Sequence, residues 1–252
     1  MRLDWLKNYN LLIFETVDST NSEALRLASA GAIGDFVITA AQQTGGRGSK
    51  GRSWTSIPGN LHTSVLLNTK AELKRYPQLS FVTANAVYET ISTFTKGKNL
   101  TLNIGLKWPN DVLINGKKVA GILLESISFG EKKYVVVGIG VNVMESPSAV
   151  SFPATSLYDE GIILKHPDEF LCILISKFDR LYKQWLLDNS FARTRKNWLR
   201  RAYNLNKVIT IDDNARRISG VFKEIDFNGS LQLQLASGQF CNFTTGIVLN
   251  EE

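Results

Sequence analysis

The sequence has few of the side chains that many enzymes use for metal binding or nucleophilic catalysis. Among 252 residues there are two cysteines, Cys172 and Cys241, and two histidines, His62 and His166. The cysteines do not have the spacing of metal ligands, and two histidines leave little room for a histidine-based metal site or catalytic triad. We therefore expect no such site, and we expect both thiols to be reduced and buried.

The chain also has no apolar run long enough to span a membrane. Its first seven residues, Met-Arg-Leu-Asp-Trp-Leu-Lys, include an early acid and no long apolar core, so they do not resemble a signal peptide. We expect a cytoplasmic protein without membrane contact.

What the chain does have is enough apolar sequence for a large core, together with excess positive charge. Hydrophobic residues make up 44% and charged residues 21%, as in a soluble globular protein. The 29 lysines and arginines exceed the 23 acids, which gives a net charge of +6. This excess favours anionic ligands or an acidic protein partner. Nucleic-acid binding has no recognisable motif to support it.

The most distinctive segment is residues 43–54, Gln-Thr-Gly-Gly-Arg-Gly-Ser-Lys-Gly-Arg-Ser-Trp. Glycine lets backbone N–H groups turn toward one point and lets a ligand approach closely. Arg47 and Arg52 add forked donors suited to carboxylate or phosphate, and Trp54 adds a flat ring face. The segment predicts a loop that closes over a small anion. The alternative is an ordinary surface loop with solvated cations.

The first half of the chain alternates short apolar runs with helical patterns, and 252 residues suit one large α/β domain or a large domain plus a small one. Strands are expected at residues 11–14, 36–40 and 61–67. Thr20 followed by Glu23 matches a capping box, so we expect a helix to begin at Thr20 and to end at Gly31. Ser19, Thr20 and Asn21 then meet at a helix N-terminus. Capping alone explains Thr20 as well as ligand contact does, but it explains the other two less easily. A second helix is expected to start near Pro77.

Residues 106–125 form the second informative segment. Asn115-Gly116 between two apolar runs predicts a two-residue hairpin turn. Pro109 breaks any helix, so Lys107 and Asp111 flank an irregular stretch. Lys118 begins the returning strand, and Gly121 leaves a gap on that strand where a ligand could lie against the backbone.

Residues 134–143 are rich in β-branched side chains and predict a central strand. Gly138 and Gly140 leave its middle without side chains. Asn142 is polar in an apolar context and must find hydrogen-bond partners. The backbone and a bound nucleotide are equally good explanations for it.

The last third predicts two helices and then a small β domain. A helix begins at Pro167 with acids in its first turn, and its predicted buried stripe is Phe170, Ile173, Leu174, Phe178, Leu181, Trp185 and Leu186. A shorter helix surrounds Trp198, next to a basic run (Arg193, Arg195, Lys196, Arg200, Arg201) that most simply forms a solvated face, with docking of a partner as the alternative. From residue 206 the pattern has period two, which predicts a small antiparallel domain of SH3-like size.

Several of these segments, taken in order, resemble the biotin protein ligases. They are Ser19-Thr20-Asn21, Gln43 with Gly46-Arg47-Gly48-Ser49-Lys50-Gly51-Arg52-Ser53-Trp54, Lys107-Trp108-Pro109-Asn110-Asp111, Lys118-Val119-Ala120-Gly121-Ile122-Leu123, and Gly138-Ile139-Gly140-Val141-Asn142. The resemblance implies an α+β fold like that of the class II synthetases, with a central mixed β-sheet flanked by helices and a small C-terminal SH3-like β-barrel. It implies a catalytic domain over residues 1–204 and the small domain over 205–252.

That family uses ATP and Mg²⁺ to form biotinyl-5'-AMP and then transfers biotin to a lysine of a biotin carboxyl carrier domain. By resemblance, biotin contacts Ser19, Thr20, Asn21, Gln43, Gly46, Arg47, Gly48, Ser49, Lys118, Gly121 and Gly138. ATP and the adenylate contact Arg47, Ser49, Arg52, Trp54, Lys107, Asn110, Lys118 and Asn142. The implied catalytic residues are Lys118, Arg47, Lys107 and Asp111, the last for the incoming lysine. No protein metal ligand is implied, since Mg²⁺ accompanies the phosphates.

The sequence departs from the family pattern in two places. Many relatives have arginine where Ser49 stands, and that arginine helps to retain the adenylate. Relatives that repress transcription carry an N-terminal helix-turn-helix domain, for which this chain has no room, so we expect a ligase that does not bind DNA. Exposed strands of the central sheet could pair with a second copy, which would give a homodimer, or with the carrier, and the sequence does not choose between these two partners.

Three other functions remain open at this point. A lipoate or octanoate ligase or transferase would share the fold, but such relatives tend to carry an Arg-Arg-x-x-Gly-Gly-Gly loop, and some use a cysteine. A non-catalytic biotin- or nucleotide-binding module is opposed by the presence of both Lys107 and Lys118. A DNA-binding repressor is favoured by charge alone.

Overall fold

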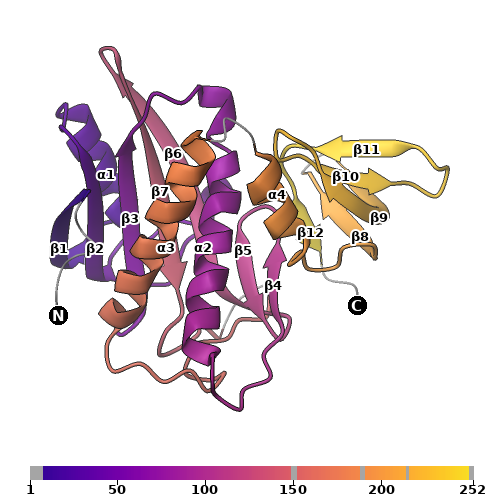
Figure 1. Ribbon diagram of the computed structural model, residues 1–252, viewed down its shortest axis with the longest axis horizontal. Coiled ribbons are helices and arrows are strands. Elements are labelled where there is room, and N and C mark those ends of the chain that lie inside the picture. The colour runs from indigo at the N-terminus through magenta and orange to yellow at the C-terminus, as the bar shows by residue number, and fades with distance from the viewer. Residues whose placement is uncertain (1–7, 149–151, 188–190, 214–215, 250–252) are drawn as a thin grey trace.

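The computed structural model describes residues 8–148, 152–187, 191–213 and 216–249. A seven-stranded mixed sheet forms its centre, helices cover both faces, and a five-stranded sheet lies beside one edge (Figure 1). The heptapeptide that argues against a signal peptide lies outside the described residues. The predicted α+β class and the central mixed sheet are confirmed.

The large sheet runs in the order β1-β2-β3-β7-β6-β5-β4. Its strands are β1 (Tyr9–Val17), β2 (Asp35–Gln43), β3 (Leu61–Asn68), β4 (Ile104–Lys107), β5 (Asp111–Ile114), β6 (Lys117–Phe129) and β7 (Lys132–Val141). The pair β1–β2 is parallel and the other neighbours are antiparallel. The strands predicted at residues 11–14, 36–40, 61–67 and 134–143 all contribute to this sheet.

Helix α1 (Thr20–Ser29) connects the two parallel strands, and its cap differs from the prediction. Ser19, not Thr20, is the N-cap, and its side chain accepts a hydrogen bond from the Ser22 backbone N–H. Glu23 does not return to the cap as a capping box requires, because its carboxylate pairs with Arg26. The Thr20 side chain is therefore free to point into the protein.

Two hairpins build the end of the sheet that holds the second motif. Strands β4 and β5 pair with Lys107 opposite Asp111, so the stretch predicted to be irregular is a tight turn over residues 108–110. The Asn115-Gly116 hairpin between β5 and β6 is confirmed. Both of its turn residues have positive φ, 51° and 79°, as a type I′ turn requires.

The two faces of the sheet have different functions. Val65, Val135 and Val137 point to the face covered by α2 (Gln78–Thr95) and α3 (Pro167–Leu187), while their neighbours Leu66 and Val136 point to the face covered by α1 (Figure 1). This alternation follows from the two-residue period of a strand. Because α1 is short, it leaves part of its face of the sheet uncovered for a ligand.

The predicted buried stripe of α3 needs two corrections. Leu186 is 38% exposed and Ile173 is half-buried, whereas Leu171, Ile175 and Tyr182 are buried in their place. The 21-residue helix lies against α2 over a wider surface than the predicted stripe, so residues on both flanks of the stripe are covered.

The basic run around α4 (Ala192–Leu199) is not simply a solvated face. Arg195 hydrogen-bonds the Ile225 carbonyl and pairs with Glu224 of the small sheet. Arg201 donates to the Asn85 side chain and lies over the Tyr88 ring. These arginines attach α4 to α2 and to the C-terminal strands.

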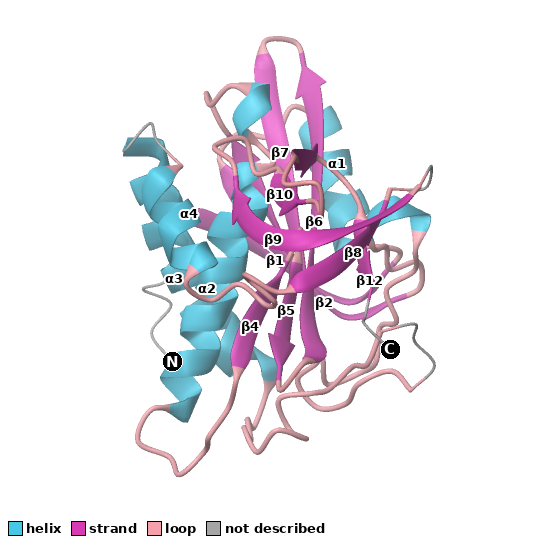
Figure 2. Ribbon diagram, turned by 90° about the vertical axis from the view of Figure 1, so that its right-hand side faces the viewer, coloured by secondary structure: helices cyan, strands magenta, loops and turns pink. Residues whose placement is uncertain are grey.

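The C-terminal strands form an antiparallel sheet in the order β11-β10-β9-β8-β12. Its strands are β8 (Val208–Asp212), β9 (Arg217–Ile225), β10 (Leu231–Gln234), β11 (Phe240–Phe243) and β12 (Ile247–Leu249). Strands β8 and β9 lie toward the viewer in Figure 2. The small antiparallel sheet is as predicted, while closure into a barrel remains a prediction. The Trp108 indole N–H donates to the Gly229 carbonyl, which ties this sheet to the β4–β5 turn.

Other sequence expectations have mixed outcomes. Cys172 and Cys241 are unpaired as predicted, but both are half-buried instead of buried. Helix α2 starts one residue after Pro77. Within the described ranges, none of the helices combines the length and apolarity needed to cross a bilayer.

Candidate functional site

A cavity of about 770 Å³ opens on the α1 face of the large sheet. Every site residue predicted above except Gly46 lines it: Ser19, Thr20, Asn21, Gln43, Arg47, Gly48, Ser49, Arg52, Trp54, Lys107, Asn110, Asp111, Lys118, Gly121, Gly138 and Asn142. Segments far apart in the sequence thus meet around one space. The volume is within the range of ligand pockets that bury a small organic molecule.

Glycines on neighbouring strands form the floor of the cavity. A Cβ at Gly138 would lie 2.3 Å from the Asn21 Oδ1 atom, and one at Gly140 would lie 2.4 Å from the Trp54 indole. Gly121 is directly opposite Gly140 and is also covered by the indole, at 2.9 Å from a built Cβ. The gap expected over Gly121 is therefore filled by Trp54, and a ligand would contact that ring before the strand.

One end of the cavity is neutral and hydrogen-bonded. The Gln43 Oε1 atom accepts from the Thr20 backbone N–H at 2.9 Å and from its hydroxyl at 3.2 Å. The Ser64 hydroxyl lies 2.7 Å from the Thr20 hydroxyl. The Gln43 amide nitrogen donates to Ser56. Thr20, held off the cap position by Ser19, is part of a polar cluster that is already ordered.

Asn21 connects this end to a carboxylate. Its Oδ1 atom accepts from Ser64 at 2.6 Å, and its Nδ2 atom donates to Glu125 at 2.8 Å. Asn21 is only 3% exposed, so both groups need the partners they have. Glu125 lies on β6 two residues beyond Leu123 and four beyond Gly121, and so on the same face of the sheet.

The other end of the cavity is cationic. The Lys118 ammonium is 2.7 Å from the Asp111 carboxylate, and it lies 5.5 Å from the Trp54 ring centroid. Lys107 is 7% exposed, and its ammonium lies 3.4 Å from the centroid of the Phe152 ring. Burial is the largest cause that lowers the pKa of Lys107, to about 8, with nearby Lys118 and Arg52 adding to the effect and Asp111 opposing it. Bound phosphates would supply the negative charge that this end lacks.

The Gly-rich loop folds back on itself above the cavity. Arg47 and Ser53 form an antiparallel bridge around a 3₁₀ turn at η2 (Ser49–Gly51), in which Lys50 and Gly51 have positive φ. Gly46 is at the base of the loop, where a Cβ would lie 2.6 Å from the Trp54 carbonyl. Gly46 is therefore required by loop closure and does not face the cavity.

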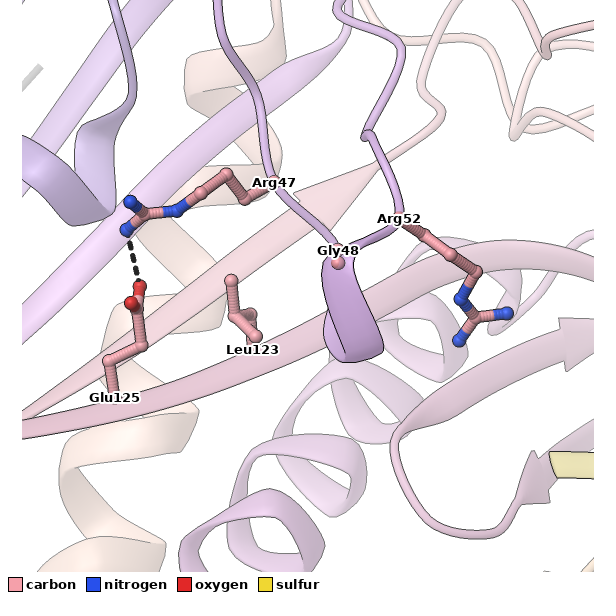
Figure 3. A pocket seen from close by; sticks show the side chains of 6 residues that line it. Arg47, Gly48, Arg52, Leu123 and Glu125 are labelled. Carbon is pink, nitrogen blue, oxygen red and sulfur yellow. Dashed lines mark hydrogen bonds and ion pairs between the residues drawn. The ribbon is translucent and has the colours of Figure 1, made fainter. Parts of the chain in front are cut away.

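The two arginines of the loop point in different directions (Figure 3). Arg47 forms an ion pair with Glu125 at 2.7 Å. Arg52 extends away from it and donates to the Ser49 carbonyl and hydroxyl. A second cavity of about 260 Å³ separates the loop from β6 between these side chains.

The two asparagines predicted to meet nucleotide are bonded to backbone. Asn142 donates to the Thr155 carbonyl at 3.0 Å, and Asn110 donates to the Ile122 carbonyl at 2.6 Å. Asn142 also aligns residues 155–157, since the Leu157 N–H donates to its carbonyl. The backbone explanation of Asn142 thus holds, although both side chains still border the cavity.

The sequence did not single out several residues at the site. Ser64 and His62 are alternate polar residues on a buried strand, a signal that period two could have revealed. Glu125 follows Gly121 and Leu123 at the same spacing. Residues 245–249 also line the cavity, and no local pattern places the C-terminal strand there. Among the described residues, no group of three or more His, Cys, Asp or Glu side chains has the arrangement of a metal site.

Comparison with known proteins identifies the family. The model of the Biotin/lipoate A/B protein ligase family matches residues 13–142. This chain belongs to that family. Within it, the chain is 38% identical over 229 residues to the biotin–[acetyl-CoA-carboxylase] ligase of Paracoccus denitrificans, covering 88% of this chain and 93% of the relative. It is 31% identical over 248 residues to the bifunctional ligase/repressor BirA of Bacillus subtilis, covering 91% and 70%.

Solved structures agree with the family assignment. The biotin protein ligase of Aquifex aeolicus in complex with biotin and ATP has a TM-score of 0.79 and 29% identity, with 95% of this chain and 97% of that chain covered. A point mutant of the Aquifex aeolicus ligase in complex with biotin has a TM-score of 0.78 and 28% identity, with 96% and 99% covered. This chain and the Aquifex aeolicus ligase thus share one fold over nearly their full lengths.

Proposed function

We propose that this protein is a biotin–protein ligase that uses ATP to attach biotin to a lysine of a biotin carboxyl carrier domain. Biotin and ATP are its substrates, and biotinyl-5'-AMP is the intermediate. The observation that carries the proposal is the polarity of the cavity, with a neutral hydrogen-bonding end and a cationic end in one continuous space. Biotin has the matching form, with a neutral ureido ring at one end and a carboxylate at the other.

The neutral end suits the ureido ring because it offers both donors and acceptors. Ser19, Thr20, Asn21 and Gln43 provide hydroxyl and amide groups, and they are already positioned by hydrogen bonds. Groups that are ordered before binding lose little entropy when the ligand arrives. The glycines at positions 121 and 138 let Trp54 and Asn21 lie close against the sheet beneath the ligand.

In the first step, an oxygen of the biotin carboxylate attacks the α-phosphorus of ATP. The bond from that phosphorus to the bridging oxygen breaks, and pyrophosphate leaves. The step brings two anions together, so cations must offset their repulsion and stabilise charge on the equatorial oxygens. Lys118, Lys107, Arg47 and Arg52 provide this charge, and Mg²⁺ enters with the ATP phosphates. Asp111 is the one carboxylate among the described residues lining the larger cavity, which fits a metal held mainly by substrate.

In the second step, a neutral lysine amine from the carrier attacks the acyl carbon, and AMP leaves as the C–N bond forms. Asp111 lies 2.7 Å from the Lys118 ammonium, at the end where the acyl carbon would lie. It receives the proton that the amine loses, or it orients that amine. Nucleophilic catalysis by cysteine or serine is not required.

The loop over residues 46–54 acts as the cover of the mixed anhydride, which water would otherwise hydrolyse. The adenine contacts Trp54 and Asn142, a role that their place in the cavity lining supports. Ser49 provides a hydroxyl at a position where relatives tend to have arginine, so the loop holds the adenylate through Arg47 and Arg52.

The remaining parts of the proposal concern organisation. Residues 1–204 form the catalytic domain and residues 205–252 form the small C-terminal domain, whose strand β12 borders the cavity. The protein acts in the cytoplasm on carrier domains and does not bind DNA. An exposed sheet edge pairs either with a second copy, which gives a homodimer, or with the carrier.

ATP–pyrophosphate exchange with biotin, lipoate and octanoate side by side tests the proposal. Exchange with biotin alone is expected, followed by transfer of biotin to a purified carrier domain. Exchange with lipoate or octanoate but not with biotin would replace the proposal with the lipoate branch of the family. Binding of biotin without exchange would leave a non-catalytic binding module.

A further inference from the structure

Residue Glu125 holds a position that neither end of the cavity explains by itself. A single carboxylate oxygen, Oε2, accepts from the Asn21 amide at 2.8 Å and from the Arg47 guanidinium at 2.7 Å. Asn21 belongs to the ordered neutral end, and Arg47 belongs to the loop that covers the cavity. Figure 3 shows Glu125 and Arg47 facing each other across the gap between β6 and the loop.

Trp54 fixes the end of the loop against Gly121 and Gly140, whereas residues 47–53 form few side-chain hydrogen bonds with the rest of the protein. Within the described part of the chain, the side-chain hydrogen bonds that leave residues 47–53 run to Glu125 alone, because those of Arg52 return to Ser49. A cavity of about 260 Å³ lies between the loop and β6 where packed side chains would otherwise hold it. The orientation of the loop tip therefore depends on the Arg47–Glu125 pair.

An exposed ion pair often contributes little, because two flexible side chains must be ordered to form it. Glu125 is different, since one partner is ordered already. The Ser64 hydroxyl bonds the Asn21 Oδ1 atom, which turns the Asn21 Nδ2 atom toward Glu125. The carboxylate is thus fixed from the buried side, and Arg47 is the one long side chain that the pair must order.

The pair also leaves Arg47 able to bind a ligand. A guanidinium has five N–H donors, and the Arg47–Glu125 bond uses the Nη2 group. The other nitrogens remain available to a ligand carboxylate or phosphate in the cavity that Arg47 lines. Glu125 can therefore orient Arg47 without competing for all of its donors.

We propose that Glu125 is a positioning residue that latches the Gly-rich loop through Arg47 and at the same time orients Asn21. The chain Ser64–Asn21–Glu125–Arg47 thereby ties the ordered neutral end to the cationic cover. The mechanical part of this proposal, that Glu125 holds the loop, applies to the free protein. The catalytic part, that Glu125 affects the reaction, rests on the proposed function.

Tryptic cleavage of the free protein tests the mechanical part, since the loop contains three trypsin sites, Arg47, Lys50 and Arg52. Glu125→Gln keeps an acceptor for the Asn21 amide but removes the charge that holds Arg47. Cleavage within residues 46–54 is expected to accelerate about tenfold, with an unchanged melting temperature. The matched control is Glu89→Gln, which breaks the Arg180–Glu89 ion pair at a carboxylate of similar exposure on α2. Wild-type cleavage of the loop in Glu125→Gln would overturn the latch, as would equal acceleration in Glu89→Gln.

The catalytic part is tested by comparing two substitutions at the same position. Glu125→Gln is expected to raise release of hydrolysed adenylate without carrier by several-fold, with the KM for biotin within about twofold of wild type. Glu125→Ala should raise both the release of hydrolysed adenylate and the KM for biotin, since the Asn21 amide loses its partner as well. Equal KM values for the two variants would contradict the role in orienting Asn21. If no variant and no wild-type sample exchanges pyrophosphate with biotin, the proposed function fails while the cleavage result still decides the latch.

Discussion

The two ends of the cavity are built on opposite principles. At the neutral end, Thr20, Asn21 and Ser64 are buried and hydrogen-bonded to one another before any ligand arrives. At the cationic end, Lys107 is buried without a carboxylate in direct contact, and Arg52 is exposed with bonds only to its own loop among the described residues. One end is complete in the free protein, and the other has an excess of positive charge.

The difference follows from the groups that each end would bind. A neutral ring gains affinity from hydrogen-bond donors and acceptors held at fixed positions. Mobile groups would lose conformational entropy on binding, and this loss would weaken the affinity. Charged phosphates provide attraction over a longer range, so their cations need not be fully ordered first. Substitutions at each end should therefore give different kinetic signatures.

The largest effect is expected for Lys118→Ala at the cationic end. Removing this preorganised charge should lower adenylate formation about 10²-fold or more, since the developing charge on phosphorus loses its stabiliser. Biotin-dependent ATP–pyrophosphate exchange measures the loss. Lys117→Ala changes the exposed neighbouring lysine and should leave the rate unchanged. Near-normal exchange in Lys118→Ala would refute the assignment.

At the neutral end, Thr20→Val should act on binding and not on chemistry. The change removes a hydroxyl that bonds both Gln43 and Ser64, while Gln43 keeps the backbone N–H of residue 20 and Ser64 keeps Asn21, so a ligand loses the hydroxyl and the order of the cluster around it. The KM for biotin should rise about tenfold while kcat stays within about threefold. Thr93→Val, on the exposed side of α2, is the control. A fall in kcat at unchanged KM would remove the distinction between the two ends.

The pH dependence of ATP use should report Lys107. Its pKa is about 8, so kcat/KM for ATP should fall above that pH by about tenfold per pH unit as the ammonium loses its proton. Lys107→Arg should abolish this fall, since a guanidinium stays charged. Between pH 8 and the ordinary lysine value of 10.5 the unfolded chain binds more protons, so the contribution of Lys107 to the free energy of unfolding increases with pH. Unfolding caused by this group therefore cannot explain the loss.

The smallest effect is expected in the share of adenylate that Arg47→Ala loses to water, since this change removes the anchor of the cover as well as one positive charge of the site. Without the Arg47–Glu125 pair the loop should open more often, and the hydrolysed adenylate released without carrier, relative to the adenylate formed, should rise about fivefold. Chromatography of the products after incubation with biotin and ATP measures the release. If no hydrolysed adenylate accumulates, the loop is not a lid.

Much of the fold could be predicted from local patterns. The Asn115-Gly116 turn needs two positive φ values, and the sequence supplies residues that tolerate them. The β-branched run at residues 134–143 predicts a buried strand, and most of it lies in β7. The predicted N-cap of α1 was wrong by one residue, because serine and threonine are both common at this position. The Thr20 hydroxyl is bonded to Ser64, and Ser19 is the cap.

The site was predictable as a set of residues but not as a set of contacts. Gly121 indicated a close approach, yet the group that approaches is the Trp54 indole. Arg195 looked solvated because the partner strand that holds it is about thirty positions away in the chain. Glu125 could not be predicted as a site residue, since no local sequence pattern shows that its carboxylate bonds Asn21 and Arg47.

By itself, the sequence determined which chemical groups are present and which local structures they favour. These are a glycine-rich basic loop, strands that carry glycines, and polar residues at the N-terminus of a helix. These follow from backbone sterics and two-residue periodicity, which act over a few residues. Tertiary structure alone decided which charges pair, why Lys107 has a lowered pKa, and that one carboxylate bonds both Asn21 and Arg47. Burial and charge pairing depend on distances between segments far apart in the chain, and only the folded sheet fixes those distances.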